Sequence, residues 1–234
     1  MKSREMEESV FKVLMIASIT LVLCVLAGIL IVIVMRGASS LNLAMLIQTP
    51  EGGYYLGKGG GIANAIVGSL YLAFGASLLS FLFGLPIAFA LQKEYLGRRL
   101  ARITRLSLDI LWGTPSIVYG AFGFIIMVYL GLRASLLGGI IALSLLMLPI
   151  MTRSIEEVIR MTPPDLKEIS YALGTTRIET TLRVVLRQAL PGIVTGVLLA
   201  FGRGIGDAAS ILFTAGYTDY IPRSLFDPVA SLPL

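Results

Sequence analysis

Histidine is absent from this chain of 234 residues, and cysteine occurs once, as Cys24. The lack of imidazole removes the commonest metal ligand and general base, so zinc chemistry and hydrolytic triads are not expected. A single cysteine cannot form an internal disulfide, and its position in an apolar run predicts a buried packing residue. Charge is also scarce, at 14% of residues against about 25% in soluble domains. With 56% hydrophobic residues and a mean hydropathy of +0.87, the composition indicates a polytopic membrane protein.

Five apolar runs are long enough to cross a bilayer, which takes about 20 residues. The first run exceeds the apolar core of a signal peptide, about 7–15 residues, so we interpret it as a retained anchor. The chain then divides into an N-terminal anchor with its outer loop, 1–61, and a transmembrane domain, 62–234. The predicted fold class is an all-α integral membrane protein. Its spans are expected at 13–35, 62–91, 106–129, 134–152 and 190–216.

Basic residues predict the orientation of these spans. With the amino terminus inside, the inner segments hold three Lys and Arg before the first span, five at 93–105 and six at 153–187, against four outside. The inner segment 93–105 contains a single acid, Glu94. The basic pI of 9.5 therefore reflects topology, and no nucleic-acid binding is expected. The outer segment Gly52–Lys58 imitates a phosphate-binding loop, but no strand precedes it and Gly59 replaces the required Ser or Thr, so we reject ATP binding there.

A charged segment between the last two spans predicts two short helices that meet at Gly174. Pro163 and Pro164 suit the start of the first helix, over 165–173, because proline is tolerated only in a first turn. The second helix is expected to start at Thr175 or Thr176. Its apolar residues fall on one side, which is an amphipathic pattern: Ile178, Leu182, Val185 and Leu186. Together they predict a bent cytoplasmic elbow, within a loop at 153–190, that can press on another protein.

The elbow contains Glu168, Ile169, Ser170 and Gly174, and Pro191 follows it. In these residues it resembles the Glu-Ala-Ala loop in the membrane subunits of ABC importers, where alanines are usual at the positions of Ile169 and Ser170. Three further stretches are similar to phosphate importer permeases of the PstA type. They are GGIANAIVG at 60–68, TPSIVYGAFG at 114–123 and PGIVTGVLLAFGRGIGDAASILFTAG at 191–216.

The resemblance implies a type I ABC importer permease, a transport subunit and not an enzyme, in a bacterial or archaeal cytoplasmic (inner) membrane. Members of this type usually have six spans, so we expect five here, with 224–234 leading toward a missing sixth. No cofactor or metal is expected on this chain, because ATP and Mg²⁺ would be bound by a cytoplasmic ATPase homodimer. That partner would grip Glu168, Ile169, Ser170, Gly174 and Thr175. A related permease subunit and a periplasmic phosphate-binding protein would complete the complex, surrounded by membrane lipid.

The fifth span contains two charged residues, Arg203 and Asp207. In an unbroken helix, Arg203 would lie about 18 Å beyond Pro191, near mid-membrane, where an arginine costs about 2.5–3.5 kcal/mol by insertion scales. Asp207 follows four residues later, on the same face and within reach of an ion pair. Two interpretations stay open. Either the pair only neutralises itself, or Arg203 contacts a phosphate oxyanion while Asp207 holds the arginine in place, as the family's translocation path implies.

Weaker features leave alternatives open. The break at Pro115 and Ser116 either exposes backbone groups to a path or is a plain kink. Asp109, near the basic segment, is expected to form a salt bridge or a cap. A permease for molybdate or sulfate, a scaffold without transport, and a secondary transporter with Asp207 as proton carrier are alternative functions. The elbow and the lack of a visible inverted repeat argue against the secondary transporter. Glycines spaced by four predict close helix packing: Gly192, Gly196, Gly202 and Gly206.

Overall fold

The computed structural model describes residues 2–51 and 59–234, and the side chains of all of these except 2–5 and 40. Within these ranges the secondary structure is helical, with no strand. The rejected phosphate-loop pattern at Gly52–Lys58 lies outside the described residues. The chain forms two compact units, Met1–Met45 and Leu46–Leu234, and each is treated by itself.

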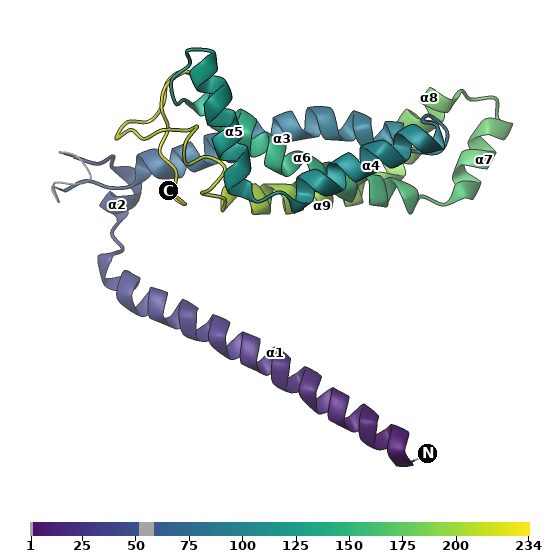
Figure 1. Ribbon diagram of the computed structural model, residues 1–234, viewed down its shortest axis with the longest axis horizontal. Coiled ribbons are helices and arrows are strands. Elements are labelled where there is room, and N and C mark those ends of the chain that lie inside the picture. Colours follow the sequence, from purple (N-terminus) through teal and green to yellow (C-terminus); the bar gives the residue numbers. More distant parts are fainter. Residues whose placement is uncertain (1, 52–58) are drawn as a thin grey trace. The chain divides into compact units, whose positions relative to one another are not determined.

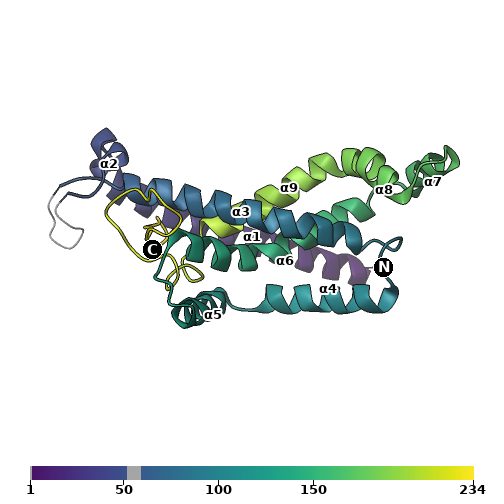
Figure 2. The same ribbon diagram turned by 90° about the horizontal axis from the view of Figure 1, so that it is seen from above.

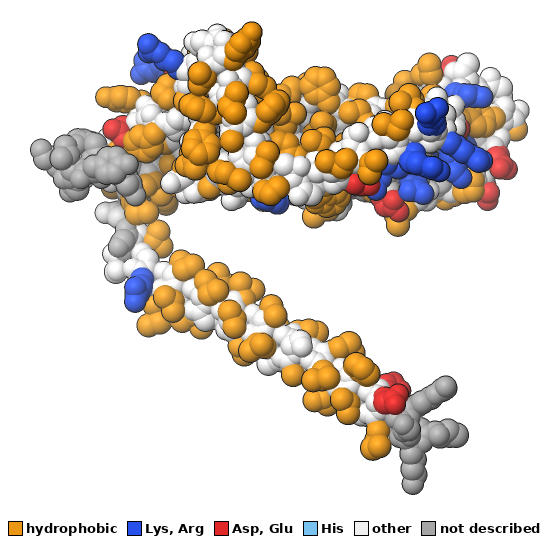
Figure 3. Space-filling view, in the orientation of Figure 1, with side chains coloured by type: hydrophobic (Ala, Val, Ile, Leu, Met, Phe, Trp, Pro, Cys, Tyr) orange, Lys and Arg blue, Asp and Glu red, His pale blue; other side chains and the backbone are white. Residues whose placement is uncertain are grey.

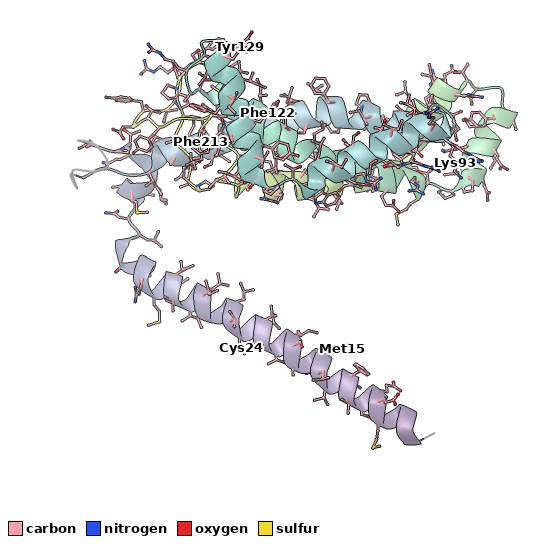
Figure 4. All side chains as sticks on the ribbon, in the orientation of Figure 1. Met15, Cys24, Lys93, Phe122, Tyr129 and Phe213 are labelled. Carbon is pink, nitrogen blue, oxygen red and sulfur yellow. The ribbon has the colours of Figure 1, made fainter. Side chains whose placement is uncertain are left out.

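The first unit is dominated by α1, Lys2–Gly37, which is followed by the short helix η1, Ala38–Ser40. From Met6 onward α1 is long and apolar enough to cross a membrane. Its apolar side chains point outward all round the helix, as expected of a helix surrounded by lipid. Cys24 lies on this helix and is exposed within the unit, so the expectation of a buried cysteine is not met there (Figure 4).

The second unit is a helical bundle in which α3, α6 and α9 pack against one another (Figures 1 and 2). α6 is central, because α4 and α5 also pack on it. The short helices α7 and α8 project at one end, here called the elbow end, while α5 and the last residues of the chain lie at the other, the tail end (Figure 1). The helices after α2, Leu43–Ile47, are α3 Ala63–Ala90, α4 Arg98–Gly113, α5 Ser116–Tyr129, α6 Leu136–Arg160, α7 Pro164–Ala172, α8 Arg177–Thr180, a π segment Thr181–Val185, and α9 Leu186–Ile205.

The core of this bundle is apolar and closely packed along α6. A Cβ placed on Gly192 would come within 2.4 Å of Val158, and one on Gly196 within 3.0 Å of Ser154, so α9 approaches α6 closely at both positions. Gly202 and Gly206 have no such neighbour, so the predicted glycine packing holds for only half of the series. The outside is also largely apolar, whereas Lys and Arg gather at the elbow end (Figure 3). The core includes Leu72, Leu143, Met147, Met151, Ile155 and Ile193.

Among the described residues, four helices are long and apolar enough to span a membrane, or five spans are present if the pair α4 and α5 counts as one. That pair bends by 99°, so the span expected at 106–129, in which a break at Pro115 and Ser116 was predicted, is divided between two helices. The cause is Pro115, which cannot continue the hydrogen-bonding pattern of a helix and pushes the preceding residue out of helical geometry. Thr114 accordingly adopts an extended conformation and its N–H bonds to the Leu111 carbonyl.

Two other predicted boundaries shift. α9 ends at Ile205 instead of 216. Gly204 and Gly206 each weaken helix propagation by about 1 kcal/mol, and contacts of the following turn with α5 stabilise the end at this point. The chain from 206 to 216 continues as turns, in which Asp207, Ser210, Ile211, Thr214 and Ala215 are buried. α6 runs to Arg160 instead of 152, because Arg153 and Glu156 remain helical and form ion pairs with α4. The elbow therefore comprises 161–185, from the end of α6 to the end of the π segment, and is shorter than the predicted 153–190 loop.

The last residues, 224–234, pack on the tail end, and we call them the cap. The first free N–H groups of α6 donate to this cap, Leu136 to the Asp227 carbonyl and Leu137 to the Leu225 carbonyl, both at 2.8 Å. Such groups have no partner within their own helix. The cap also lies on α3, where a Cβ on Gly68 would come within 2.0 Å of the Ala230 carbonyl oxygen. This contact explains the glycine that closes the GGIANAIVG stretch.

Candidate functional site

The elbow has the predicted architecture. α7 begins at Pro164, and Gly174 follows its end with a φ of +82°, a conformation that favours glycine. Thr176 then caps α8: its Oγ1 accepts from the Glu179 N–H at 3.3 Å, and its own N–H donates to the Glu179 carboxylate at 2.9 Å. The hydrogen bonds from Thr176 lower the pKa of the Glu179 carboxyl below its usual value. Proline, glycine and threonine therefore fix the bend locally.

Three hydroxyl groups close the inside of the bend. Ser170 Oγ lies 2.7 Å from Thr175 Oγ1 and 3.0 Å from Thr180 Oγ1, and the two threonine oxygens are 2.8 Å apart. Ser170 and Thr180 are buried. Of the five residues predicted to meet the ATPase, Ser170 and Thr175 therefore face into the elbow, whereas Glu168, Ile169 and Gly174 are exposed.

An apolar surface faces outward from the elbow. Ile169 and Leu173 of α7 are 59% and 79% exposed. Ile178 and Leu182 are exposed too, whereas Val185 is buried, so the apolar side predicted for the second helix is divided between surface and core. Exposed apolar side chains on a projecting element are typical of a protein interaction site. We call this set the elbow surface: Ile169, Leu173, Ile178 and Leu182.

The loop between α3 and α4 braces the elbow from the side. Glu94 accepts hydrogen bonds from Lys167 Nζ at 2.9 Å and from the Tyr171 hydroxyl at 3.2 Å. Burial, and then the Glu94 charge, raises the pKa of the Tyr171 phenol. Tyr95 donates its hydroxyl to the Arg177 carbonyl at 2.8 Å. The sequence marked Glu94 only as a lone acid in a basic segment, and no pattern pointed to Tyr95.

A charged network joins α4 to α6 near the same end. Glu156 is 1% exposed and accepts from Arg105 Nε at 2.7 Å and from Arg153 Nη1 at 2.9 Å. Arg153 also pairs with Asp109 at 3.2 Å, which confirms the predicted salt bridge of Asp109. Arg105 donates in addition to the Leu91 carbonyl at 2.8 Å. Each buried charge in this network is thus paired and hydrogen-bonded, as a low-dielectric environment requires.

Arg203 and Asp207 lie together where α9 ends. Arg203 is in the last turn of α9, and Asp207 follows the helix, so the prediction that both share one helix is wrong. Arg203 Nη1 nevertheless lies 3.8 Å from Asp207 Oδ2, an ion pair too long to be a hydrogen bond. The arginine side chain is 50% exposed and the aspartate 3%. Among the described residues, Asp207 Oδ2 has no hydrogen-bond partner.

The predicted helix break at Pro115 and Ser116 does not itself bond to this pair, but α5, which follows the break, lies close to it. Pro115 is exposed and Ser116 is partly buried, and in the described part of the chain neither makes a polar contact with the pair. The approach is made by Gly120 of α5, where a Cβ would come within 2.7 Å of the Ala209 carbonyl oxygen and 2.8 Å of that of Ser210. The bent helix therefore lies directly against the turn that follows Asp207.

The fold resembles those of known transporters. One similar solved structure is described as "Inward facing conformations of the MetNI methionine ABC transporter". The match has a TM-score of 0.57 and 23% sequence identity, and covers 62% of this chain and 70% of the chain in that structure. The chain also matches an amino acid ABC transporter crystallised with histidines at a TM-score of 0.54 and 20% identity, over 64% and 70%. At this identity the matches show a similarity of fold alone.

Sequence comparison narrows this class. The family model described as "Binding-protein-dependent transport system inner membrane component" matches residues 80–230, and the chain belongs to this family. "Phosphate transport system permease protein PstA 1" of Mycobacterium tuberculosis (strain CDC 1551 / Oshkosh) is 41% identical over 75% of this chain, which spans 58% of that relative's length. "Phosphate transport system permease protein PstA" of Yersinia pestis is 36% identical over 99% of this chain and 78% of the relative.

Proposed function

We propose that this chain is a permease subunit of an ATP-driven phosphate importer. The observation that carries the proposal is its 41% identity, over 177 residues, to a protein named as a phosphate transport permease. The arrangement of the second unit agrees with that role, because a bundle of apolar helices ends in a projecting elbow with an apolar surface. In this function the chain performs no covalent chemistry, and ATP and Mg²⁺ are bound by a separate ATPase.

The elbow surface is the proposed contact with that ATPase. Glu168, Ile169 and Gly174 belong to the contact, because they are exposed at the tip. Ser170 and Thr175 support it from inside through their shared hydroxyl bonds. Movement of an ATPase pair would then be transmitted to α6 and α9, which flank the elbow in sequence.

The Arg203–Asp207 pair is the proposed point of contact with phosphate on the translocation path. A half-exposed guanidinium can offer several donors to an oxyanion. Because Asp207 is buried and its pairing at 3.8 Å is loose, Arg203 is left with free hydrogen-bonding capacity. The nearby carboxylate repels a bound anion, so phosphate would be held only briefly, as conduction requires.

The orientation and the remaining partners follow from the same role. The elbow end carries most of the basic residues and is proposed to be cytoplasmic, with the amino terminus inside and the tail end outside. A periplasmic phosphate-binding protein would deliver its ligand at the tail end. A related but distinct permease would complete the path, in the inner membrane of a bacterium or archaeon.

The test is transport by the assembled complex in liposomes. With ATP inside, labelled phosphate should be taken up, and Arg203→Ala should lower uptake at least about tenfold, since a charged hydrogen bond contributes ~1.5–3 kcal/mol. Arg203→Lys keeps the charge but loses the planar fork, and should retain part of the activity. Sulfate and molybdate serve as competing oxyanions.

Several outcomes would contradict the proposal. Normal phosphate uptake by the Arg203→Ala complex, at equal assembly, would remove the pair from the path. Preferential uptake of sulfate or molybdate would assign another substrate. Uptake that persists without ATP but collapses with the proton gradient would favour the secondary transporter, in which the buried carboxylate of Asp207 carries a proton.

A further inference from the structure

Two adjacent residues in the loop between α3 and α4 contact both helices of the elbow, α7 and α8, and the π segment that follows them. Glu94 binds α7 through Lys167 and Tyr171. Its backbone carbonyl accepts from Arg177 Nη1 of α8 at 2.9 Å. Tyr95 binds the Arg177 carbonyl and also the hydroxyl of Thr181, at the start of the π segment. The elbow is thus held by its own covalent connections to α6 and α9, and by a third support that is far away in sequence.

The same loop is tied to α4. Arg105 reaches back from α4 to donate to the Leu91 carbonyl, just after α3 ends. Arg105 also pairs with the buried Glu156, which binds Arg153, which in turn pairs with Asp109 of α4. A continuous series of polar contacts and one short loop therefore runs from the elbow through Glu94 to both α4 and α6.

Apolar packing between α4 and its neighbours is thin at this end. The apolar cluster that holds the beginning of α4 contains three buried residues, Leu91, Ala101 and Leu108. A cavity of about 1130 Å³ is lined by members of the polar series, among them Glu94, Arg105 and Lys167. Packed cores resist displacement because they are close to crystal density, whereas a cavity leaves room for movement. The polar contacts therefore determine how α4 follows the elbow.

We propose that Glu94 and Tyr95 are positioning residues that transmit movement of the elbow to α4 and the bent α5. The proposal rests on the proposed function, in which an ATPase moves the elbow. A displacement of the elbow pulls the α3–α4 loop through Glu94 and Tyr95, and α4 follows through Arg105. α5 continues from α4 and contacts Ala209 and Ser210 through Gly120, next to Asp207. The route therefore ends at the candidate path.

The test measures coupling in the assembled complex, reconstituted with its ATPase, permease partner and binding protein. Glu94→Gln combined with Tyr95→Phe removes the charge and the phenol hydroxyl with little change of volume. We expect ATP hydrolysis to continue while phosphate taken up per ATP hydrolysed falls about tenfold, the effect of losing a charged hydrogen bond. Lys93→Gln in the same loop is the matched control and should be unchanged, because Lys93 is exposed and has no polar contact among the described residues (Figure 4).

A charge exchange separates positioning from simple destabilisation. Glu94→Lys should lower the coupling ratio, and adding Lys167→Glu should restore it in part, since the ion pair is rebuilt with its ends reversed. A destabilised fold would not recover in the double variant. An unchanged ratio in the Glu94→Gln/Tyr95→Phe complex, or no recovery on exchange, would overturn the proposal.

A second readout does not depend on the substrate. In a Cys24→Ser background, Ile110→Cys on the exposed face of α4 reports how nucleotide changes its labelling by a maleimide. We expect ATP trapping to change this labelling rate in the parent complex and to change it much less in the Glu94→Gln/Tyr95→Phe complex. If phosphate is not the substrate, uptake fails in all complexes while this difference remains. If Glu94 and Tyr95 do not transmit movement, both complexes respond alike.

Discussion

Single residues explain why several sequence stretches need glycine. At Gly120 and Gly68 the reason is space and not backbone conformation, because neither has a positive φ and both face carbonyl groups of the C-terminal residues. At Gly174 the reason is the reverse, since its φ is positive and no atom lies within 4 Å of a Cβ. Only the second kind, a glycine that ends a helix before a new cap, can be inferred from local sequence.

Gly120→Ala should destabilise the bundle. The new methyl group would meet the Ala209 and Ser210 carbonyl oxygens, and forced overpacking costs typically ~1–3 kcal/mol. Thermal denaturation of the detergent-purified protein, followed by size-exclusion chromatography, measures the loss. Gly113→Ala is the control, because nothing lies within 4 Å of its Cβ. Equal melting temperatures for the two variants would show that α5 is not in close contact with the turn.

For the Arg203–Asp207 pair, the sequence predicted the ion pair but not the local backbone structure. The two charges in an apolar span identify the pair, and the ion pair is present. The end of α9 between them was not predicted, because a glycine-rich helix and a glycine-rich turn have the same local pattern. Tertiary contacts decide between them, and here the turn is stabilised by contacts with α5 and the cap.

At the scale of elements, the elbow was predicted well because its signals are local. Pro164, Gly174 and Thr176 each act within one turn of the helix they begin or end. The bend between α4 and α5 was underestimated, since Pro115 predicts a break but not its angle. The brace from Glu94 and Tyr95 was not predicted, because contacts between segments far apart in sequence leave no periodic pattern.

Thr176→Ala should loosen α8 by about 0.5–2 kcal/mol, the usual contribution of a helix cap. Hydrogen exchange of the amides at 177–181 should accelerate accordingly, whereas Ser107→Ala, an exposed hydroxyl within α4, should leave them unchanged. The helix cap formed by Thr176 and Glu179 also depends on pH. Because the folded pKa of Glu179 is lowered, its contribution is complete above the ordinary value near 4.5 and is lost as pH falls through the lower folded value. Hydrogen-exchange rates that change neither with Thr176→Ala nor with pH would argue against the hydrogen bonds between Thr176 and Glu179.

At the scale of the whole molecule, composition was enough for the class and the number of membrane-crossing runs. The described residues contain helices at all five predicted runs, although the third is bent and the fifth is shorter. The cap was not predicted, because it has little regular structure and is held by backbone hydrogen bonds to α6 and by one from the Leu232 N–H to Ser69 Oγ of α3. Residues 224–234 were interpreted as an approach to a sixth span, whereas Leu225 and Asp227 belong to this cap.

Cysteine labelling tests the proposed orientation. In a Cys24→Ser background, Leu173→Cys at the elbow end and Tyr220→Cys at the tail end are both exposed positions. A maleimide that cannot cross the membrane should label only Tyr220→Cys in intact cells, and both variants after the membrane is opened. Labelling of Leu173→Cys in intact cells would place the elbow outside and remove its contact with a cytoplasmic ATPase.

The bonds from Leu136 and Leu137 to the carbonyls of residues 225 and 227 also bear on biogenesis. The central helix emerges from the ribosome long before the residues that complete its first turn, and in hydrocarbon an unpaired amide is costly. α6 is therefore inserted into the membrane early, whereas the N–H groups of its first turn find their hydrogen-bond partners late. Until residues 225 and 227 have been synthesised, the outer start of α6 must remain near water or be shielded by another chain, so synthesis interrupted before them would expose this helix to quality-control proteases first.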